Sequence, residues 1–161
     1  MSPDNSGECF VEPYDILATN DVWDFLIVRF GSNNAAQPTL RIALHGAVDV
    51  PQNYVGSPVI RIVWTATLTA GNVVWDFDYR AVGGDDVESL DQAGTQEAVT
   101  VTDAAPSAAH ERNTPSVALT AANLAAGDTL EFTLFRDGTD AADTMAGSAL
   151  LVGAYLEYSD A

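Results

Sequence analysis

The chain has 161 residues, which is enough for one domain to enclose a hydrophobic core without a metal or a disulfide. Its formal net charge is -17, from 23 acidic and six basic residues, and this disfavours direct binding to nucleic-acid phosphates or to anionic membranes. The single cysteine, Cys9, excludes an internal disulfide, and the apolar fraction of 47% argues against disorder.

The N-terminal stretch MSPDNSGECF has no positive region followed by an apolar one, and no later segment approaches the roughly 18 uncharged apolar residues of a membrane span. We therefore expect neither secretion through a signal peptide nor membrane insertion. All six basic residues are arginines, and the absence of lysine fits either a GC-rich genome or adaptation to salt.

Short runs of β-branched and apolar residues recur along the chain, with turn-forming clusters between them and no long helical pattern. This spacing is typical of an antiparallel β-sandwich or barrel, so we expect one all-β domain, residues 1–161, with about eight or nine strands. The predicted strands span residues 9–17, 22–30, 38–46, 58–69, 72–82, 96–102, 115–120, 128–136 and 149–158.

Apolar and polar side chains alternate in three of these strands, which predicts one face in the core and the other in solvent. Arg41, His45 and Arg61 fall on solvent faces, as do Glu131 and Thr133. The residues assigned to core faces are Leu40, Ile42, Leu44, Ile60, Ile62, Trp64, Ala66, Leu68, Leu130, Phe132 and Leu134.

The tetrapeptide Val-Trp-Asp-Phe occurs twice, at residues 22–25 and 74–77. Burying a large aromatic side chain stabilises a fold by roughly 2 to 3 kcal/mol. We interpret the two copies as two core strands, with an ancient duplication as the alternative. The inward-facing residues are then Trp23, Phe25 and Ile27 in the first copy and Trp75, Phe77 and Tyr79 in the second.

Two segments that connect predicted strands have an informative composition. Ala70-Gly71-Asn72 lies between two long strand runs and predicts a tight hairpin. The segment 103–116, DAAPSAAHERNTPS, holds two prolines and no periodicity. It predicts an exposed loop that is long enough to reach a neighbouring molecule.

The sequence contains no recognisable catalytic motif. The two histidines, His45 and His110, lie on the solvent side of a predicted strand and in the proline-containing loop, without a local nucleophile signature. Carboxylates are so abundant that pairs of them say little about glycosidase chemistry. We assign no catalytic and no cofactor-binding residues and expect surface or partner-contact roles for both histidines.

Two acidic loops are candidates for binding a hard cation such as calcium. Asp137, Asp140 and Asp143 could converge with help from loop carbonyls, but the spacing is not that of an EF-hand. The alternative is a solvated acidic turn, and we assign no metal ligands. The second loop contains Asp85, Asp86, Glu88 and Asp91.

Exposed aromatic residues could instead stack on sugar rings. Most of the aromatic residues fall at inward positions of predicted strands. For the others we expect core or subunit contacts rather than a sugar platform. These are Tyr14, Tyr54, Tyr155 and Tyr158.

Residues 58–161 contain a distinctive series of turns and aromatic strands. It runs through the segments VIRIVWTATLTAGNVVWDFDYRAV, VTVTDAAPSAAHERN and SVALTAANLAAGDTLEFTLFRDGTDAADTMAGSALLVGAYLEYSDA. A Trp-bearing strand follows Gly71, a turn at 125–128 leads into a strand that ends in Phe-Arg-Asp-Gly at 135–138, and Leu-Glu-Tyr lies near the end. In these features residues 58–161 resemble small virion proteins encoded among the structural genes of tailed phages.

That resemblance implies a jelly-roll-like sandwich that coats or cements a capsid. We expect a non-enzymatic decoration protein on the outer capsid surface of a virion, bound to the major capsid protein and present as a homotrimer. The acidic charge is compatible with that location, because packaged DNA would repel the chain from the interior. We expect residues 1–15 to form an extended polar arm that reaches a neighbouring subunit. A trimer would cover Leu26, Val28, Phe30, Val63 and Phe135, which alternation places away from the core.

Two rival functions remain. The chain could be a tail, head-fibre or baseplate module that recognises a surface glycan through exposed aromatics and loops. It could also be a depolymerising enzyme, although the poor histidine and motif inventory argues against this.

Overall fold

A computed structural model describes residues 9–15, 24–30, 41–83 and 94–161. The described residues form nine β-strands and one short 3-10 helix, η1. The elements are β1 (Cys9–Asp15), β2 (Asp24–Phe30), β3 (Arg41–Asp49), β4 (Tyr54–Thr65), β5 (Asn72–Val82), β6 (Glu97–Ala104), β7 (Ser116–Ala118), η1 (Ala121–Asn123), β8 (Thr129–Asp137) and β9 (Ala149–Asp160).

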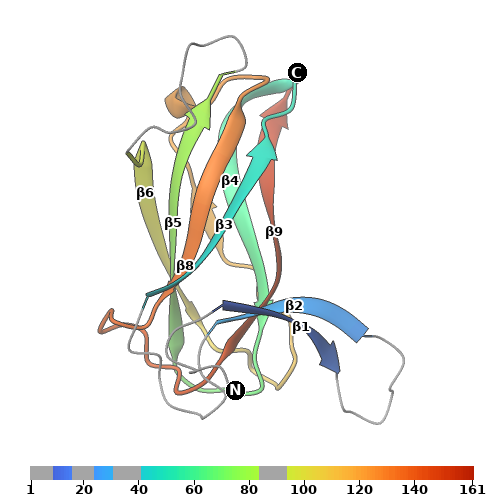
Figure 1. Ribbon diagram of the computed structural model, residues 1–161, viewed down its shortest axis with the longest axis vertical. Helices are drawn as coiled ribbons and strands as arrows, with labels where there is room; N and C mark the ends of the chain where they lie inside the picture. The colour runs from blue at the N-terminus through green and yellow to red at the C-terminus, as the bar shows by residue number, and fades with distance from the viewer. Residues whose placement is uncertain (1–8, 16–23, 31–40, 84–93) are drawn as a thin grey trace, which may run out of the picture.

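The strands form two antiparallel sheets that pack face to face along the long axis of the molecule (Figure 1). The five-stranded sheet has the order β1-β2-β9-β4-β7, and the four-stranded sheet has the order β3-β8-β5-β6. β2 pairs with β9, β3 with β8, β4 with β7 and β5 with β6, so successive pairs alternate between the sheets. This winding is the jelly-roll topology, with β1 added at one edge. The predicted all-β, antiparallel, jelly-roll-like sandwich is confirmed.

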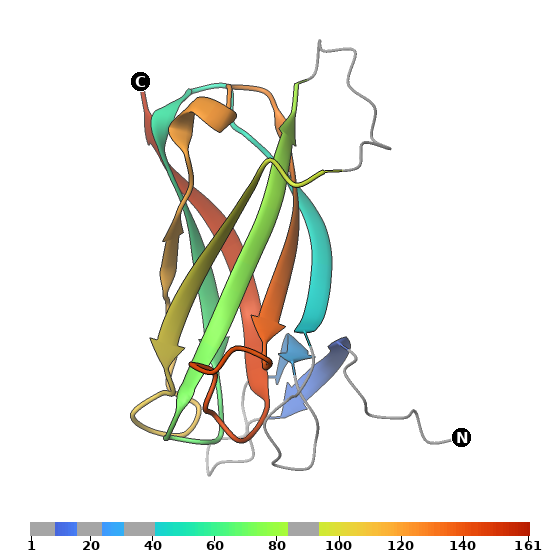
Figure 2. The same ribbon diagram turned by 90° about the vertical axis from the view of Figure 1, so that its left-hand side faces the viewer.

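The β1–β2 pair lies at the end of the sandwich opposite the C-terminus (Figures 1 and 2). Its ladder runs from the pair Cys9 and Phe30 to the pair Asp15 and Asp24. Residues 9–15, which the sequence placed both in a strand and in an arm, are therefore part of the five-stranded sheet. The rest of the predicted arm, residues 1–8, lies outside the described residues.

Strand β4 begins and ends earlier than the predicted range 58–69. Its ladder with β9 extends back to Tyr54 through an irregular register at Gly56. It ends at Thr65 because the partner of that residue, Leu150, lies at the start of β9. Leu68, assigned to the core by alternation, consequently lies beyond the strand and is 37% exposed.

Strand β3 is displaced from the predicted range 38–46, because its ladder with β8 runs from the pair Arg41 and Asp137 to the pair Asp49 and Thr129. The assigned core faces are otherwise confirmed wherever the side chains are described. Ile60, Ile62, Trp64, Ala66, Leu130 and Leu134 are buried, and Leu44 and Phe132 pack half-buried against the core. Leu40 and the side chain of Ile42 lie outside the described part.

The predicted hairpin at residues 70–72 is wrong. β4 pairs with β7 and β9, whereas β5 pairs with β6 and β8, so residues 66–71 cross from one sheet to the other. The turn chemistry itself was sound, since Gly71 adopts a φ of 93°. A side chain there would also meet the backbone of Met145 at 2.7 Å. Local turn residues cannot report which sheet the next strand will join.

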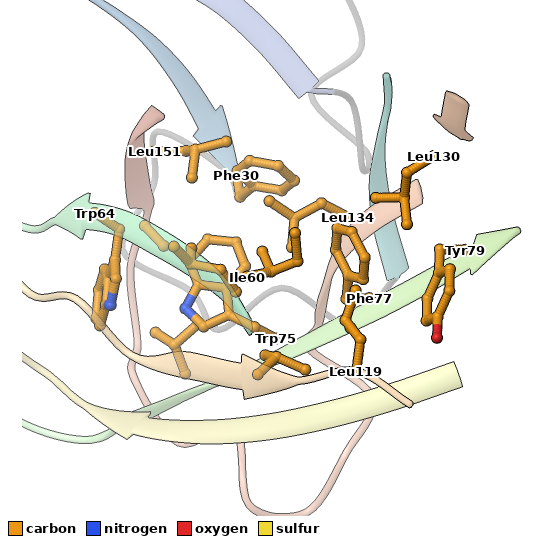
Figure 3. Close-up of a cluster of buried hydrophobic side chains, with 14 of the residues drawn as sticks. Phe30, Ile60, Trp64, Trp75, Phe77, Tyr79, Leu119, Leu130, Leu134 and Leu151 are labelled. Atoms are coloured by element: carbon orange, nitrogen blue, oxygen red, sulfur yellow. The ribbon is translucent and has the colours of Figure 1, made fainter. Parts of the chain in front are cut away.

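The second Val-Trp-Asp-Phe copy lies in the centre of the core. Trp75 and Phe77 on β5 are buried, and Trp75 packs edge-on against Trp64 with ring centroids 5.9 Å apart. Phe77 stacks on Phe132 at 5.1 Å. Figure 3 shows the rings of Trp64, Trp75 and Phe77 among the buried side chains of the core. The interpretation as a core strand is therefore confirmed for this copy, while Trp23 and the side chains of Phe25 and Ile27 lie outside the described part.

The phase predicted for β2 is wrong. Alternation placed Val28 and Phe30 away from the core, but Phe30 is 0% exposed and packs edge-on against Trp75 at 5.2 Å. The reason lies in the register, since Val28 pairs with Leu151 and Phe30 with Ala149, and cross-strand partners share a face. Phe30 is thus unavailable as a subunit contact. The side chain of Leu26 lies outside the described part.

Candidate functional site

The two histidines lie on different elements. His45 is exposed on β3, on the solvent face that alternation predicted, and its Nδ1 is 2.9 Å from Thr133 Oγ1. His110 lies between β6 and β7, where its backbone N–H donates to the carbonyl oxygen of Ala66 at 2.9 Å. The side chain of Cys9 lies outside the described part.

The three aspartates of the loop after β8 do not converge on one point. Asp137 and Asp140 each accept a hydrogen bond from a backbone N–H two residues later, as in Asx turns. Asp143 is instead fully buried and forms an ion pair with Arg136. The described residues contain no group of three or more His, Cys, Asp or Glu side chains placed to hold a metal ion. The other acidic loop, with Asp85, Asp86, Glu88 and Asp91, lies outside them.

One hollow, of about 470 Å³, lies on the outer face of the four-stranded sheet. Four of its polar groups form two pairs. Arg80 Nε donates to Glu131 Oε2 at 2.5 Å, and Thr133 Oγ1 lies 2.9 Å from His45 Nδ1. Asp78 and Phe135 also line it.

A second hollow, of about 430 Å³, lies on the outer face of the five-stranded sheet. β4 supplies Arg61, and β9 supplies Tyr155 and Glu157. Arg61 is the direct cross-strand partner of Tyr155, and Glu157 stands two residues further along β9 on the same face. The Arg61 guanidinium reaches diagonally to Glu157, with Nε 2.8 Å from Oε2 and Nη2 3.5 Å from Oε1.

The segment before β7 completes this hollow. Asn113 pairs with Trp64 in an isolated bridge, and its amide points inward to donate to Asp103 Oδ2 at 3.1 Å. Trp64 Nε1 donates to the same oxygen at 2.8 Å. Because successive side chains alternate on an extended backbone, the neighbours of Asn113, Arg112 and Thr114, are directed outward into the hollow.

The predicted exposed loop 103–116 is confirmed in its middle part, where residues 105–112 form no strand and residues 107–109, 111 and 112 are exposed, whereas both ends pair with neighbouring strands. Asp103 belongs to β6, and the N–H of Ile62 on β4 donates to the carbonyl of Pro115 at 3.0 Å. The Glu111 carboxylate accepts from Ser107 Oγ, which is the main reason why its pKa lies below the ordinary value. The segment is held against β4 by backbone hydrogen bonds.

The charged groups of the second hollow differ in whether a neighbouring side chain already neutralises them. The hydrogen bond from Arg61, and then its positive charge, lower the pKa of Glu157 and keep it ionised, and the same bond raises the pKa of Arg61. These two groups neutralise each other. Arg112 is exposed, and no residue in the described part of the chain forms a hydrogen bond or ion pair with it.

The tyrosines for which the sequence predicted core or subunit contacts differ clearly in burial. Tyr54 is buried, and Tyr158 packs beside it with ring centroids 6.0 Å apart, so both have the expected core role. Tyr155 is 48% exposed. The side chain of Tyr14 lies outside the described part. Sequence reasoning did not connect Tyr155 with Arg61, because the hollow joins segments that lie up to 96 residues apart.

No helix in the described residues has the length and apolar character needed to cross a membrane. No protein-family profile matches the sequence, and no curated protein matches it. Among solved structures, TmCBM61 in complex with β-1,4-galactotriose is similar, with a TM-score of 0.42 and 12% sequence identity. The match covers 83% of this chain and 71% of that chain. The jelly-roll assignment rests on the strand pairing described above.

Proposed function

We propose that this chain is a non-catalytic decoration protein that binds the outer surface of a virus capsid and stabilises the shell by contacting the major capsid protein. The resemblance of residues 58–161 to small phage virion proteins motivates this assignment. The jelly-roll topology supports it, because viral capsid and lectin domains use this fold. The net charge of -17 supports an exterior location, since packaged DNA repels such a surface.

The observation that carries the proposal is an open, partly apolar surface over β4 and β9. Val152 is 43% exposed and Tyr155 is 48% exposed on β9, and Val59 and Val63 on β4 are half-buried. Apolar residues gathered on one sheet face are costly in water and are typical of a surface that another molecule covers. Tyrosine and arginine, both present here, are also enriched at the energetic centres of protein interfaces.

The proposed homotrimer cannot use all of the residues that alternation placed away from the core. Phe30 is in the core, while Val63 lies on the outer face of the five-stranded sheet and Phe135 lines the hollow on the opposite outer face. We assign the β4–β9 face to the capsid and the opposite face to other copies of this chain. Bound as a trimer, contacts of modest strength would add up to firm retention.

Rebinding to particles stripped of this protein tests the proposal. The purified chain should saturate the shell at a fixed ratio to the capsid protein, measured by quantitative gel densitometry and by electron cryomicroscopy. The variant Val152→Ser with Tyr155→Ser should lose at least about tenfold in apparent affinity, whereas Ala47→Ser on β3 should not. Intact particles that carry far fewer copies of this chain than of the capsid protein would show that cementing is wrong.

A second candidate function is a glycan-binding module of a tail, head fibre or baseplate. It is favoured by the half-exposed Tyr155 ring, which lies in a hollow with the hydrogen-bonding groups of Arg61, Arg112 and Glu157. A ring flanked by polar groups suits the apolar face and the hydroxyls of a sugar. The isolated protein should then bind members of a glycan array, with Tyr155→Ala abolishing binding and Tyr155→Phe retaining it. Equal signals for both variants would argue against this candidate.

A further inference from the structure

The second hollow concentrates positive charge in an otherwise acidic protein. The whole chain has six basic residues against 23 acidic ones, and two of the six, Arg61 and Arg112, line this hollow with a single carboxylate, that of Glu157. The first hollow has the opposite balance, with Arg80 beside Asp78 and Glu131. The two outer faces therefore favour ligands of different charge.

The two arginines of the second hollow have different roles. Arg61 is bound to Glu157 through Nε and Nη2, so its position is set and its charge is compensated. Arg112 has no such partner among the described residues, and the bridge of Asn113 to Trp64 holds its backbone at the rim. A guanidinium presents a planar set of donors that matches the two oxygens of a carboxylate. Arg112 is therefore the group placed to pair with an anionic ligand.

The remaining wall of the hollow suits a ring. Tyr155 stands directly across from Arg61 and exposes 48% of its surface. Two residues earlier on the same face is Gly153, where an added Cβ would have nothing within 4 Å, so the space beside the Tyr155 ring is open. The Thr114 hydroxyl and the Glu157 carboxylate add hydrogen-bonding groups to the donors of the arginines. This combination fits a polyhydroxylated ring that carries one acidic group.

We propose that the hollow formed by Arg61, Arg112, Thr114, Tyr155 and Glu157 binds a uronic acid residue of an acidic glycan. The sugar ring packs on Tyr155, and its carboxylate pairs with Arg112. Arg61 and Glu157 bind hydroxyl groups of the ring. This inference rests on the glycan-binding candidate above and specifies its ligand class.

Titration calorimetry on the full chain tests the inference with matched probes. The probes are trimers of galacturonate, glucuronate and mannuronate, together with the same trimers methyl-esterified at every carboxylate. At low salt, at least one acid trimer should bind about tenfold or more tightly than its ester, and added salt should reduce that difference.

Three variants assign the roles. Arg112→Gln should remove the preference for acid over ester while leaving weak binding of the ester. Tyr155→Ala should weaken both ligands together. Arg80→Gln changes the net charge equally but lies on the opposite face, so it should leave both affinities unchanged, and thermal unfolding should show that every variant is folded.

The other outcomes are each decisive. Equal affinity for acid and ester would overturn the uronic acid assignment and would instead support a module that binds neutral glycans. Absence of binding to any acidic or neutral glycan would overturn both and leave capsid attachment untouched. Acetate or a polyglutamate peptide binding as tightly as the best trimer would show a general anion or acidic protein site, and so contradict the sugar assignment.

Discussion

Arg136 and Asp143 form a fully buried ion pair that anchors the loop after β8 to the core. Both side chains are 0% exposed, and the pair is bidentate, with Nε 2.9 Å from Oδ2 and Nη2 2.8 Å from Oδ1. The guanidinium also donates to the carbonyl oxygens of Met145 and Gly147, and Asp143 Oδ2 accepts from the N–H of Val74. The loop therefore folds back against the beginning of β5 (Figure 2).

Replacing Asp143 by Ala should lower the free energy of unfolding by about 3 to 5 kcal/mol, because Arg136 is left as a buried charge without its partner. Urea unfolding measures this. Asp140→Ala, in the exposed turn of the same loop, is the matched control and should cost less than about 1 kcal/mol. The double variant Arg136→Met with Asp143→Leu should cost less than the sum of the losses for Arg136→Met alone and Asp143→Leu alone. Additive losses would contradict the coupling.

Gly71→Ala should destabilise the protein by at least about 2 kcal/mol. The residue has a φ of 93°, and its added Cβ would lie 2.7 Å from backbone atoms of Thr144 and Met145. Gly153→Ala is the control, since nothing lies within 4 Å of its Cβ position. The midpoints of chemical denaturation of the two variants should differ clearly. Similar midpoints would show that residues 144–145 can move away from the added Cβ at little cost in free energy.

The contact between Tyr79 and Glu97 should make stability depend on pH at both extremes. The Tyr79 hydroxyl, followed by the Thr120 N–H, lowers the pKa of Glu97. A carboxyl with a depressed pKa stabilises the fold above its ordinary value of about 4.5 and loses that contribution as the pH falls through the folded-state pKa. Glu97→Gln should therefore flatten the fall in Tm below about pH 4.5.

On the alkaline side, burial and then the bond to Glu97 raise the pKa of Tyr79 from 10.0 to about 12. A raised pKa contributes stability that is complete below pH 10 and is lost as the pH rises toward 12. Tyr79→Phe should reduce the loss of Tm in that window relative to the wild type. An unchanged alkaline profile would mean that other groups control it.

Phe30→Ala should lower the free energy of unfolding by about 3 to 5 kcal/mol, because Phe30 fills the core against Trp75. The effect should not depend on protein concentration, because the Phe30 side chain is buried within one subunit. Phe135→Ala, on the outer face, should cost less in folding but should shift the association equilibrium in analytical ultracentrifugation. Concentration-dependent unfolding of Phe30→Ala alone would instead support an interface role.

Local patterns located the strands well for a physical reason. Alternation with a period of two reports that a stretch is extended and half-buried, and the runs around Ile60, Phe77 and Leu134 show it without ambiguity. In β2 both faces carry apolar residues, so alternation led to the wrong phase, and the pairing of Phe30 with Ala149 sets the correct one. Arg136 has the same parity as Leu134, and its burial depends on the ion pair with Asp143, which no local pattern reveals.

The amino-acid sequence by itself determined the all-β class, the approximate strand positions, the acidic surface and the glycine-dependent turn at Gly71. The tertiary structure alone decided which sheet each strand joins and which side chains meet. The candidate site shows why, since Arg61, Arg112 and Tyr155 belong to separate strands or edges and come together only through the β4–β9 ladder and the Asn113 bridge. Contacts between distant segments are selected by the packing of the whole core, which no local periodicity encodes.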